Sequence, residues 1–410
     1  MVLLTVIWVI VALSLFMSLF WLNILYKKRE EIDSYPEPEN LPSISIIIPA
    51  YNEEEVIESS IRSVLDQDYP KDKIEVIVVN DGSEDSTKDI AENFLENPRF
   101  HLLNQENQGK GVAINAGREI ASGEILAVQD ADSVIEEEAF RKMVGCFEDS
   151  SVGGVIAGIK PLNNKTFWEH LQKVEYIIGI LYRKLMALIS TLYVTPGALS
   201  MYRRDLIDEV GGFDENNLTE DLEIALRLRK KGYELDMSAP AVTKTQFPQN
   251  FFSLMKQRVR WFRGMISNTF KYREMMFNRE YGLFGMFQMP LNLAFPFLSL
   301  VGGIIVIYGI GELLMDFFLH LSAVGLTMPN PFEGLTVYKA IIGFNMKVYF
   351  PLIAGVFFSG LLIYLSHKLT DEGLDNPFSM AGFFIFYHII LGLFWGIALV
   401  KEISASEKRW

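Results

Sequence analysis

Long apolar segments lie on both sides of a polar middle part of the chain. The first, residues 2–25, holds no charged residue and is long enough to cross a bilayer as a helix. Three more apolar stretches lie at about 284–310, 340–365 and 380–400. This pattern predicts several membrane spans and a polar part at 40–280.

Basic residues beside the first apolar segment predict its orientation. Lys27, Lys28 and Arg29 follow that segment directly, so the positive-inside rule predicts an external N-terminus and a cytoplasmic chain from residue 30 onward. A cleaved signal peptide would need basic residues before the apolar run and a small-residue cleavage site after it, and the sequence has neither. We therefore expect a multi-pass protein of the cell membrane.

The segment 311–337 separates two of the apolar stretches. It carries Glu312, Asp316 and Glu333 without any Lys or Arg, which is typical of an external loop. Glu312, Asp316 and His320 recur at four-residue spacing and would share one helical face. Such residues could bind a metal, but the solvated side of an amphipathic surface helix explains the spacing without a ligand, and we favour that interpretation.

In the polar part, short β-branched runs alternate with segments of helical periodicity. Strands are predicted at 43–49, 73–80, 100–105 and 123–130, and helices at 53–66, 84–96 and 110–121. This alternation is typical of βαβ units and predicts an α/β fold with a parallel sheet. In such sheets ligands bind at the carboxyl ends of the strands.

Composition and charge narrow the class of function. Half of the 410 residues are hydrophobic and 21% are charged, which fits apolar spans joined to a polar body. The net charge of −14 argues against a nucleic-acid partner, because phosphate recognition needs a basic face. The single cysteine, Cys146, excludes an intramolecular disulfide and a multi-cysteine zinc site.

Acidic residues follow three of the predicted strands, in "PAYNEE" (49–54), "NDGSEDS" (80–86) and "QDADS" (129–133). Taken alone, Asp81-Gly82 is an ordinary turn. Three acidic strand ends at one sheet edge would repel one another, so we expect a cation or polar ligand there. The alternating aspartates of "QDADS" offer hard oxygen ligands to Mg²⁺ or Mn²⁺ and would leave open positions for phosphate oxygens.

Six motifs in order resemble those of the membrane-integrated family 2 glycosyltransferases, which include cellulose, chitin, hyaluronan and poly-N-acetylglucosamine synthases. The motifs are PAYNEE, NDGSEDS, NQGKGVAINAG, QDADS, LTED (218–221) and QRVRW (257–261). The resemblance covers about 41–264. It implies a GT-A (Rossmann-like) glycosyltransferase domain with α-helical transmembrane segments, and inverting transfer from a nucleotide sugar. The implied domains are an N-terminal transmembrane helix (1–30), a cytoplasmic GT-A domain with interfacial helices (40–280) and a C-terminal transmembrane region (281–410).

The resemblance assigns the donor-side residues by motif. Tyr51 and Glu53 correspond to a part that contacts the nucleoside. Asp81 corresponds to the carboxylate that reads the base, typically uracil. Lys110 lies where the family has a basic residue near the nucleotide.

The remaining carboxylates are assigned to the reaction itself. Asp130 and Asp132 correspond to the residues that hold the diphosphate and Mg²⁺ or Mn²⁺, with Asp132 as the direct ligand. Asp221 matches the general base, and Glu220 is assigned to the acceptor. Inverting transfer is one in-line displacement, which needs a base and a stabilised leaving group but no protein nucleophile. The alternative interpretation of "LTED" is a helix N-terminus capped by Thr219 and followed by acidic first-turn residues. The two interpretations are compatible, because a helix N-terminus can also hold a general base.

The basic segment before the C-terminal apolar region has two interpretations. On a helix, Gln257, Arg260 and Trp261 share a face at i, i+3 and i+4. As in the family, the first two would bond the diphosphate and Trp261 would stack on the acceptor sugar. A membrane anchor would need only an aromatic residue and scattered basic ones, and Lys256 and Arg263 are assigned to that role.

Two further segments of the polar part have a predicted structure. Residues 167–190 predict an amphipathic helix that is either interfacial or part of the core. "VTPGALSMYRR" (194–204) corresponds to an acceptor-side strand.

The function predicted from these motifs is the extension of a β-linked polysaccharide, to which export could be coupled. The sugar donor is typically UDP-linked. One alternative is transfer of a single sugar to a lipid acceptor such as polyprenyl phosphate or a glycolipid. A receptor or scaffold with an inactive nucleotide-sugar domain is disfavoured, because base, metal ligands and QRVRW are all present.

Overall fold

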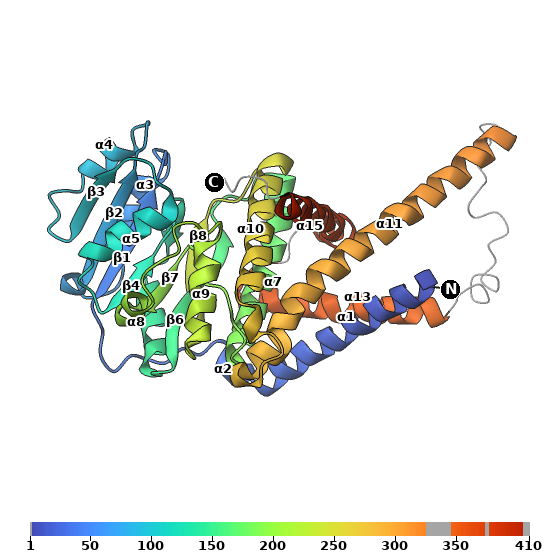
Figure 1. Ribbon diagram of the computed structural model, residues 1–410, viewed down its shortest axis with the longest axis horizontal. Helices are drawn as coiled ribbons and strands as arrows, with labels where there is room; N and C mark the ends of the chain where they lie inside the picture. The colour runs from blue at the N-terminus through green and yellow to red at the C-terminus, as the bar shows by residue number, and fades with distance from the viewer. Residues whose placement is uncertain (1, 325–345, 374–376, 405–410) are drawn as a thin grey trace.

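The computed structural model describes residues 2–324, 346–373 and 377–404 (Figure 1). Over these residues an eight-stranded sheet has the order β3-β2-β1-β4-β7-β6-β8-β5. The strands are β1 (Ile44–Ala50), β2 (Ile74–Asp81), β3 (Phe100–Gln105), β4 (Ile125–Val128), β5 (Ser133–Ile135), β6 (Val152–Pro161), β7 (Ser200–Arg203) and β8 (Glu234–Thr245). The four strands predicted from the sequence are thus all present.

The sheet is parallel in its first half and mixed in its second. β3, β2, β1 and β4 run parallel, and Ile44 of β1 is in register with both Ile74 and Ile125. β7 lies antiparallel between β4 and β6, and β5 lies antiparallel to β8. The α/β prediction is confirmed, but strand–helix alternation gave only the parallel half. β7 follows β6 through a long helix (Phe167–Leu188) and yet pairs with it antiparallel, and β5 follows β4 through a short turn and pairs with β8.

Helices cover both faces of this sheet. Those in the polar part are α3 (Ile57–Leu65), α4 (Thr87–Glu92), α5 (Lys110–Ile120), α6 (Ala139–Val144), α7 (Phe167–Leu188), α8 (Arg204–Glu209), α9 (Glu220–Lys230) and α10 (Phe251–Lys271). β1 is buried on both sides: Ile46 packs with α3 and α6, and Ile47 with α5 and α9. This double burial explains why the strands read as continuous apolar runs.

Two predicted helices are shorter than their periodicity suggested. The helix expected at 53–66 begins at Ile57, and the one expected at 84–96 is confined to Thr87–Glu92. The reason is local competition from side chains, since Asp85 accepts hydrogen bonds from the backbone N–H of Thr87 and from that of Glu54.

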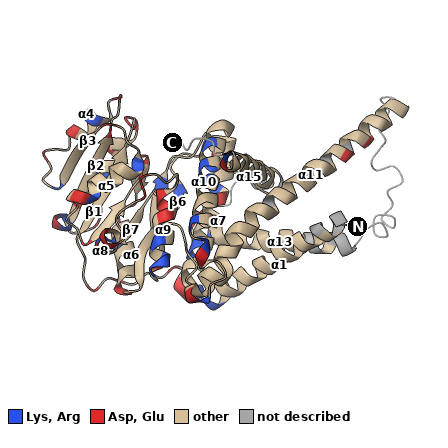
Figure 2. Ribbon diagram, in the orientation of Figure 1, with Lys and Arg blue, Asp and Glu red and all other residues tan. Residues whose placement is uncertain are grey.

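The apolar helices lie beyond α7 and α10, away from the sheet (Figure 1). They are α1 (Val2–Lys27), α11 (Met289–Val324), α13 (Met346–Leu369), α14 (Pro377–Gly382) and α15 (His388–Ile403), and the short α2 (Arg29–Ile32) follows α1. Within the described residues, Trp8–Lys27 and Phe284–Ala323 are long and apolar enough to cross a membrane, by length and composition alone. Figure 2 shows that charged residues gather on the sheet and on α9 and α10, and are sparse on α1, α11 and α13.

The apolar stretch expected to end near 310 continues as helix α11 to Val324. Glu312, Asp316 and His320 therefore lie on this helix, where all three are exposed. The part of the chain that the structure describes contains no group of three or more acidic, His or Cys side chains arranged to hold a metal. The external loop expected from residue 311 is therefore helical over residues 311–324, within a candidate span. Glu333 and the start of the predicted 340–365 span lie outside the described residues.

Helix α7 packs on both of its sides. Leu171, Val174 and Leu181 are fully buried, and the helix contacts β6 and β8 on one side and α13 and α14 on the other. Thr166 and Glu169 close its N-terminus as a capping box. Of the two interpretations from the sequence, the core helix is the better description, because α7 is sandwiched between the sheet and the apolar helices.

Basic residues of α10 hold the C-terminal helices against the sheet domain. Arg263 is buried and forms an ion pair with Glu402 of α15 at 3.1 Å. Arg258 is buried and pairs with Glu175 of α7 at 2.6 Å, and the hydroxyl of Tyr387 donates to the same carboxylate. The prediction that Arg263 anchors the helix to lipid is therefore wrong: its charge is neutralised inside the protein.

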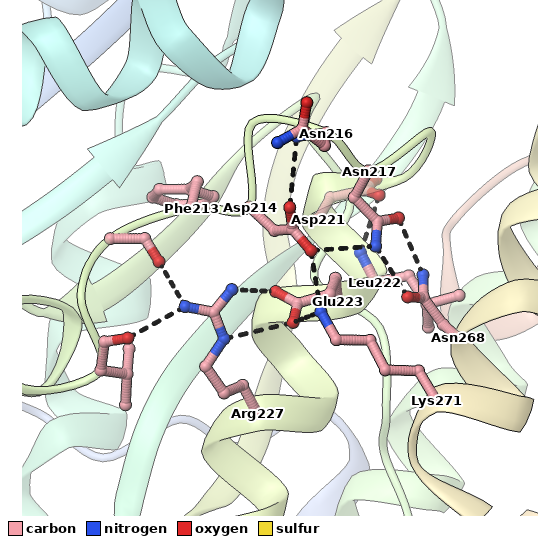
Figure 3. Close-up of polar contacts among 12 residues, drawn as sticks. Phe213, Asp214, Asn216, Asn217, Asp221, Leu222, Glu223, Arg227, Asn268 and Lys271 are labelled. Carbon is pink, nitrogen blue, oxygen red and sulfur yellow. Dashed lines mark hydrogen bonds and ion pairs between the residues drawn. The ribbon is translucent and has the colours of Figure 1, made fainter. Parts of the chain in front are cut away.

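A buried polar network joins α9 to α10 (Figure 3). The fully buried Glu223 carboxylate accepts from Arg227, Lys271 and Tyr272. Lys271 also reaches Asp214, at 2.8 Å, in the loop before α9. A buried carboxylate is retained only when several charged or hydrogen-bonded partners compensate it, so this network fixes the distance between the two helices.

The same two helices approach most closely at Gly264. A Cβ on this residue would overlap the side chain of Thr219, which precedes α9. Only glycine allows this contact, and so the N-terminus of α9 is held directly against α10.

We expect Gly264→Ala to destabilise the protein by about 1–3 kcal/mol, the usual cost of overpacking a close contact. The substitution should push α9 away from α10 and lower the midpoint of thermal unfolding in detergent. Gly302→Ala on α11 is the matched control, because no atom lies within 4 Å of its added Cβ. Equal midpoints for the two variants would contradict the proposed contact.

Candidate active site

One cavity of about 620 Å³ opens between the carboxyl ends of β1, β2 and β4 and the helices α7, α9 and α10. All eleven residues predicted for the site line it. They are Tyr51, Glu53, Asp81, Lys110, Asp130, Asp132, Glu220, Asp221, Gln257, Arg260 and Trp261. The fold thus brings together three strand ends (β1, β2 and β4), the starts of α5 and α9, and the middle of α10.

The first two acidic loops are bonded to each other. The backbone N–H of Asn52 donates to Ser83 at 3.0 Å, and that of Glu53 donates to Thr87 at 2.7 Å. Asn52 has φ of 56°, a left-handed conformation that asparagine tolerates better than most residues. These contacts fix Glu53 at the mouth of the cavity.

Asp81 has a structural task that its motif did not reveal. Its buried carboxylate accepts from the side chain of Gln105 and from the backbone N–H groups of Gln108 and Gly109, at 2.7 to 2.9 Å. It therefore holds the loop that leads into α5. Gly109 has φ of 95°, which requires glycine there. The role of Asp81 in reading a base stays a prediction.

The carboxylates at this end of the cavity repel one another. Burial, with the charges of Asp132 and Asp130, raises the pKa of Glu53 to about 7. Burial and Asp130 raise the pKa of Asp132 to about 6, although Thr245 donates to its carboxylate at 3.0 Å. Carboxylate oxygens at this density fit a divalent cation, which prefers oxygen ligands. Since no three such side chains in the described residues are arranged to hold a metal, a cation held by Asp130 and Asp132 stays a prediction that needs further oxygens from a bound diphosphate.

Lys110 lies between the two halves of the cavity. Its ammonium is 2.5 Å from Asp130 and 3.1 Å from Glu220. Although burial alone lowers it, these carboxylates hold the pKa of Lys110 above its usual value. A Cβ on Gly197 would lie 2.5 Å from this ammonium, so the glycine of "VTPGALS" makes room for the pair.

Asp221 is in the first turn of α9, beside Glu220. Burial and the charge of Glu220 raise the pKa of Asp221 to about 6, and one of its oxygens accepts from the N–H of Leu222 at 2.7 Å. One oxygen of Glu220 is buried and has no partner within the described residues. Both carboxylates can therefore accept a hydrogen bond from a ligand hydroxyl.

Thr219 occupies the N-cap position of α9, but its side chain makes no capping bond. Its hydroxyl instead accepts from Asn268 of α10 at 3.0 Å. The predicted Thr cap is therefore wrong in its bonding, because packing against α10 captures the hydroxyl. The acidic first turn that accompanied this prediction is present.

The α10 residues share one face, as their spacing predicted. Arg260 donates to the carbonyl of Leu218 at 3.0 Å, and Gln257 accepts from Arg258 at 2.9 Å. The Arg258 guanidinium lies 4.2 Å from the centroid of the Trp261 ring. One face of the indole is thus occupied by a buried cation, which fixes the ring at the cavity wall.

Sequence reasoning missed several residues of the cavity. Trp395 of α15 lines it and stacks on Phe262 with ring centroids 4.0 Å apart. Arg183 and Tyr182 of α7 and Tyr193 line its far end. No local motif marked them, because each comes from a segment whose periodicity indicated only an apolar or amphipathic helix, or a strand.

Comparisons with known proteins agree with this geometry. The model of the family described as "Glycosyl transferase family 2" matches residues 45–211. A probable glycosyltransferase of Bacillus subtilis is 28% identical over 389 residues, which are 90% of this chain and 86% of that protein. A poly-beta-1,6-N-acetyl-D-glucosamine synthase of Staphylococcus epidermidis is 31% identical over 262 residues, 61% of this chain and 63% of the synthase.

A solved structure shares the fold over nearly the whole chain. It is a mannosyltransferase from Pyrobaculum calidifontis in complex with GDP-Man and Mn²⁺, with a TM-score of 0.62, 20% identity and coverage of 99% of this chain and 100% of that one. The family 2 part of the resemblance drawn from the six motifs is thereby confirmed, and its membrane-integrated part stays a prediction. Residues 45–211 thus form a glycosyltransferase family 2 domain with a GT-A-like fold, and this family supports glycosyl transfer from a nucleotide sugar.

Proposed function

We propose that this protein is an inverting glycosyltransferase of the cell membrane that moves a sugar from a UDP-linked donor to an acceptor hydroxyl at Asp221. The observation that carries the proposal is the division of one cavity into two ends. The Asp130–Asp132 pair lies on the side of the sheet and Asp221 and Trp261 lie on the side of α9 and α10, with Lys110 between them. Donor and acceptor would meet between them.

The reaction follows from this division. Asp221 takes the proton of the acceptor hydroxyl while that oxygen attacks the anomeric carbon, and the bond from this carbon to the diphosphate breaks on the opposite side. A pKa of about 6 suits a base that must be ionised yet still basic near neutral pH. Glu220 would accept a second hydrogen bond from the acceptor and orient it.

The leaving diphosphate would be bound by cationic and polar groups of the chain. Lys110, Arg260 and Gln257 line the cavity and can donate to its oxygens. Asp130 and Asp132 would hold Mg²⁺ or Mn²⁺, which supplies positive charge to the diphosphate. Tyr51, Glu53 and Asp81 would contact the nucleoside.

For the acceptor, the first candidate is a growing β-linked polysaccharide, coupled to export if the apolar helices form a path. Its support is the likeness to the staphylococcal synthases. The second candidate is a lipid acceptor that receives one sugar, and the observation that favours it is the cationic Arg183 at the apolar end of the cavity. A nucleotide-sugar receptor without catalysis has less support, since a base with a raised pKa lines the cavity.

The proposed arrangement in the membrane keeps the domains expected from the sequence. Residues 1–30 and 281–410 would be membrane regions around a cytoplasmic domain at 40–280. Two candidate spans and the sparse charge of α1 and α11 support this (Figure 2). The external N-terminus is proposed from Lys27, Lys28 and Arg29 alone.

The direct test is incubation of the purified protein with a panel of radiolabelled nucleotide sugars, with and without membrane lipid, followed by separation of products by size. One donor should give labelled product. A ladder of sizes would support polysaccharide extension, and a single extractable lipid product would support the second candidate. Nucleotide binding without label transfer from any donor would contradict the proposed function.

We expect Asp221→Asn to lower the transfer rate by about 10²–10⁴-fold, the usual contribution of a general base, while UDP affinity stays within about twofold. The matched control is Asp205→Asn at the start of α8, because Asp205 is exposed and also accepts from the next residue's N–H, at 2.9 Å. UDP affinity that falls together with the rate would make Asp221 a donor-binding or structural residue.

The pKa of Asp221 also predicts how rate depends on pH. A base works only when ionised, and the raised pKa of about 6 means that protonation begins close to neutrality. The value of kcat/KM for the acceptor should therefore fall about tenfold per pH unit below 6. The residual activity of Asp221→Asn should not show this fall at acidic pH. If the fall persists in the variant with the same midpoint pH, it belongs to another titrating group.

Removal of divalent cations should abolish transfer, because Glu53, Asp130 and Asp132 together with a diphosphate would concentrate negative charge that Lys110 alone does not offset. Activity would be measured after EDTA treatment and dialysis, and again after addition of Mg²⁺ or Mn²⁺. The midpoint of thermal unfolding serves as the control for an intact fold. Full activity in excess EDTA would rule out the proposed cation.

A further inference from the structure

Arg258 of α10 lies behind the wall of the active-site cavity. The described residues of that wall include Gln257 and Trp261 but not Arg258. Only 1% of Arg258 is exposed, so its side chain is out of reach of a donor or an acceptor. A buried guanidinium is costly to desolvate, and the contacts that compensate it therefore indicate its role.

Arg258 acts on the donor side of the cavity through the residue that precedes it. Its Nη1 donates to the side-chain oxygen of Gln257 at 2.9 Å. Since a guanidinium has donors only, the atom that faces it must be the amide oxygen, and the NH₂ group of Gln257 is left to donate to a ligand in the cavity. Arg258 thereby decides which end of this amide a diphosphate would meet.

The same guanidinium lies against two aromatic rings of the wall. Its Cζ is 4.2 Å from the centroid of the Trp261 ring and 5.7 Å from that of the Tyr176 ring. A cation at the shorter distance is attracted to the indole by the ring's quadrupole. Arg258 therefore holds Trp261 in one orientation at the wall.

Glu175 and Tyr387 fix the guanidinium itself. Nη2 of Arg258 donates to Glu175 at 2.6 Å, and the hydroxyl of Tyr387 donates to the same carboxylate oxygen, also at 2.6 Å. Tyr387 is fully buried and ends a π-helical turn, Phe383–Tyr387, that precedes α15. Such turns are rare and occur frequently at functional sites. Because the donors of a guanidinium form a rigid planar fork, the bond of Nη2 to Glu175 also sets the direction of Nη1 and the orientation of the plane.

We propose that Arg258 is a positioning residue for glycosyl transfer: held by Glu175 and Tyr387, it directs the NH₂ group of Gln257 to the donor diphosphate and holds the Trp261 ring for the acceptor. This inference rests on the proposed function, which assigns Gln257 to the diphosphate. It deepens that function, because one buried group outside the cavity controls a donor contact and an acceptor contact together. Through Tyr387, the C-terminal region takes part in this control.

The alternative is that Arg258 only joins helices. Arg263 offers the comparison, since it is also a buried arginine of α10 and pairs with Glu402 of α15 at 3.1 Å. It lies outside the described wall of the cavity. If both arginines only join helices, the same substitution should have the same kind of effect at both positions.

The test is a double-mutant cycle on UDP binding to the full chain in detergent, with Mg²⁺ present. Gln257→Ala should weaken UDP binding by about tenfold, the loss expected for one hydrogen bond to a charged group. Arg258→Lys keeps the charge beside Glu175 but lacks the fork, and it should weaken UDP binding by about three- to tenfold. In the Gln257→Ala background, Arg258→Lys should change UDP affinity by less than about twofold, because its effect passes through that amide.

Tyr387→Phe and Arg263→Lys complete the set of variants. Tyr387→Phe removes one hydroxyl outside the cavity, and it should give a smaller loss of UDP affinity that Gln257→Ala also cancels. This variant tests the proposal even if Arg258→Lys does not fold. Arg263→Lys is the matched control, and it should lower the midpoint of thermal unfolding but bind UDP as the wild type does.

The orientation of Trp261 is measured by fluorescence. The contribution of this residue is the difference between each protein and the same protein with Trp261→Phe. Quenching of that contribution by acrylamide should increase in Arg258→Lys, because the ring loses the planar cation that it lies against. It should not change in Arg263→Lys.

Four results would overturn the proposal. They are an equal loss of UDP affinity from Arg258→Lys with and without Gln257, wild-type UDP affinity in both Arg258→Lys and Tyr387→Phe, a loss in Arg263→Lys that Gln257→Ala cancels, and unchanged quenching of Trp261 in Arg258→Lys. None of these measurements involves sugar transfer. Unchanged UDP affinity in Gln257→Ala would instead contradict the donor contact in the proposed function, so the two failures are distinguishable.

Discussion

The ammonium group of Lys110, between Asp130 and Glu220, offsets the negative charge on which the whole cavity is built. Without it, the carboxylates that end β1 and β4 and those that begin α9 would face one another across a buried space. Its position also links the donor end to the acceptor end, since it contacts one carboxylate of each. The raised pKa values of Glu53, Asp132 and Asp221 show that this compensation is incomplete. The cavity is therefore poised to accept further positive charge and ligand hydroxyls.

The acceptor end depends on how closely α9 and α10 approach. Gly264 allows Thr219 to pack against α10, and the buried Glu223 of α9 accepts from Lys271 (Figure 3). Glu223 also accepts from Tyr272, the residue that follows α10. Asp221 on one helix and Trp261 on the other are thus held at a fixed separation. Positioning of this kind matters for transfer because a small displacement of the base from the acceptor hydroxyl is costly in rate.

Helix α10 also joins the sheet to the apolar helices. Its polar residues face two ways. Gln257 and Arg260 line the cavity, whereas Arg258 and Arg263 form ion pairs with Glu175 and Glu402, respectively. Through these pairs α15 brings Trp395 to the cavity wall. Helix α15 is consequently part of the wall of the site.

Sequence alone determined the elements whose signals lie within short windows. Continuous β-branched runs predicted β1 to β4, and the acidic residues that follow them predicted a ligand site at the sheet edge. The i, i+3, i+4 spacing predicted the shared helix face of Gln257, Arg260 and Trp261. Tertiary structure decided what depends on partners distant in the chain. It placed β7 antiparallel inside the sheet and extended α11 to Val324. It also paired Arg263 with Glu402 and bonded the Thr219 hydroxyl to Asn268 instead of to its own helix. Local periodicity is set by backbone geometry over a few residues, but the partner of a buried charge is set by which segments the packed fold brings within a few ångströms of it.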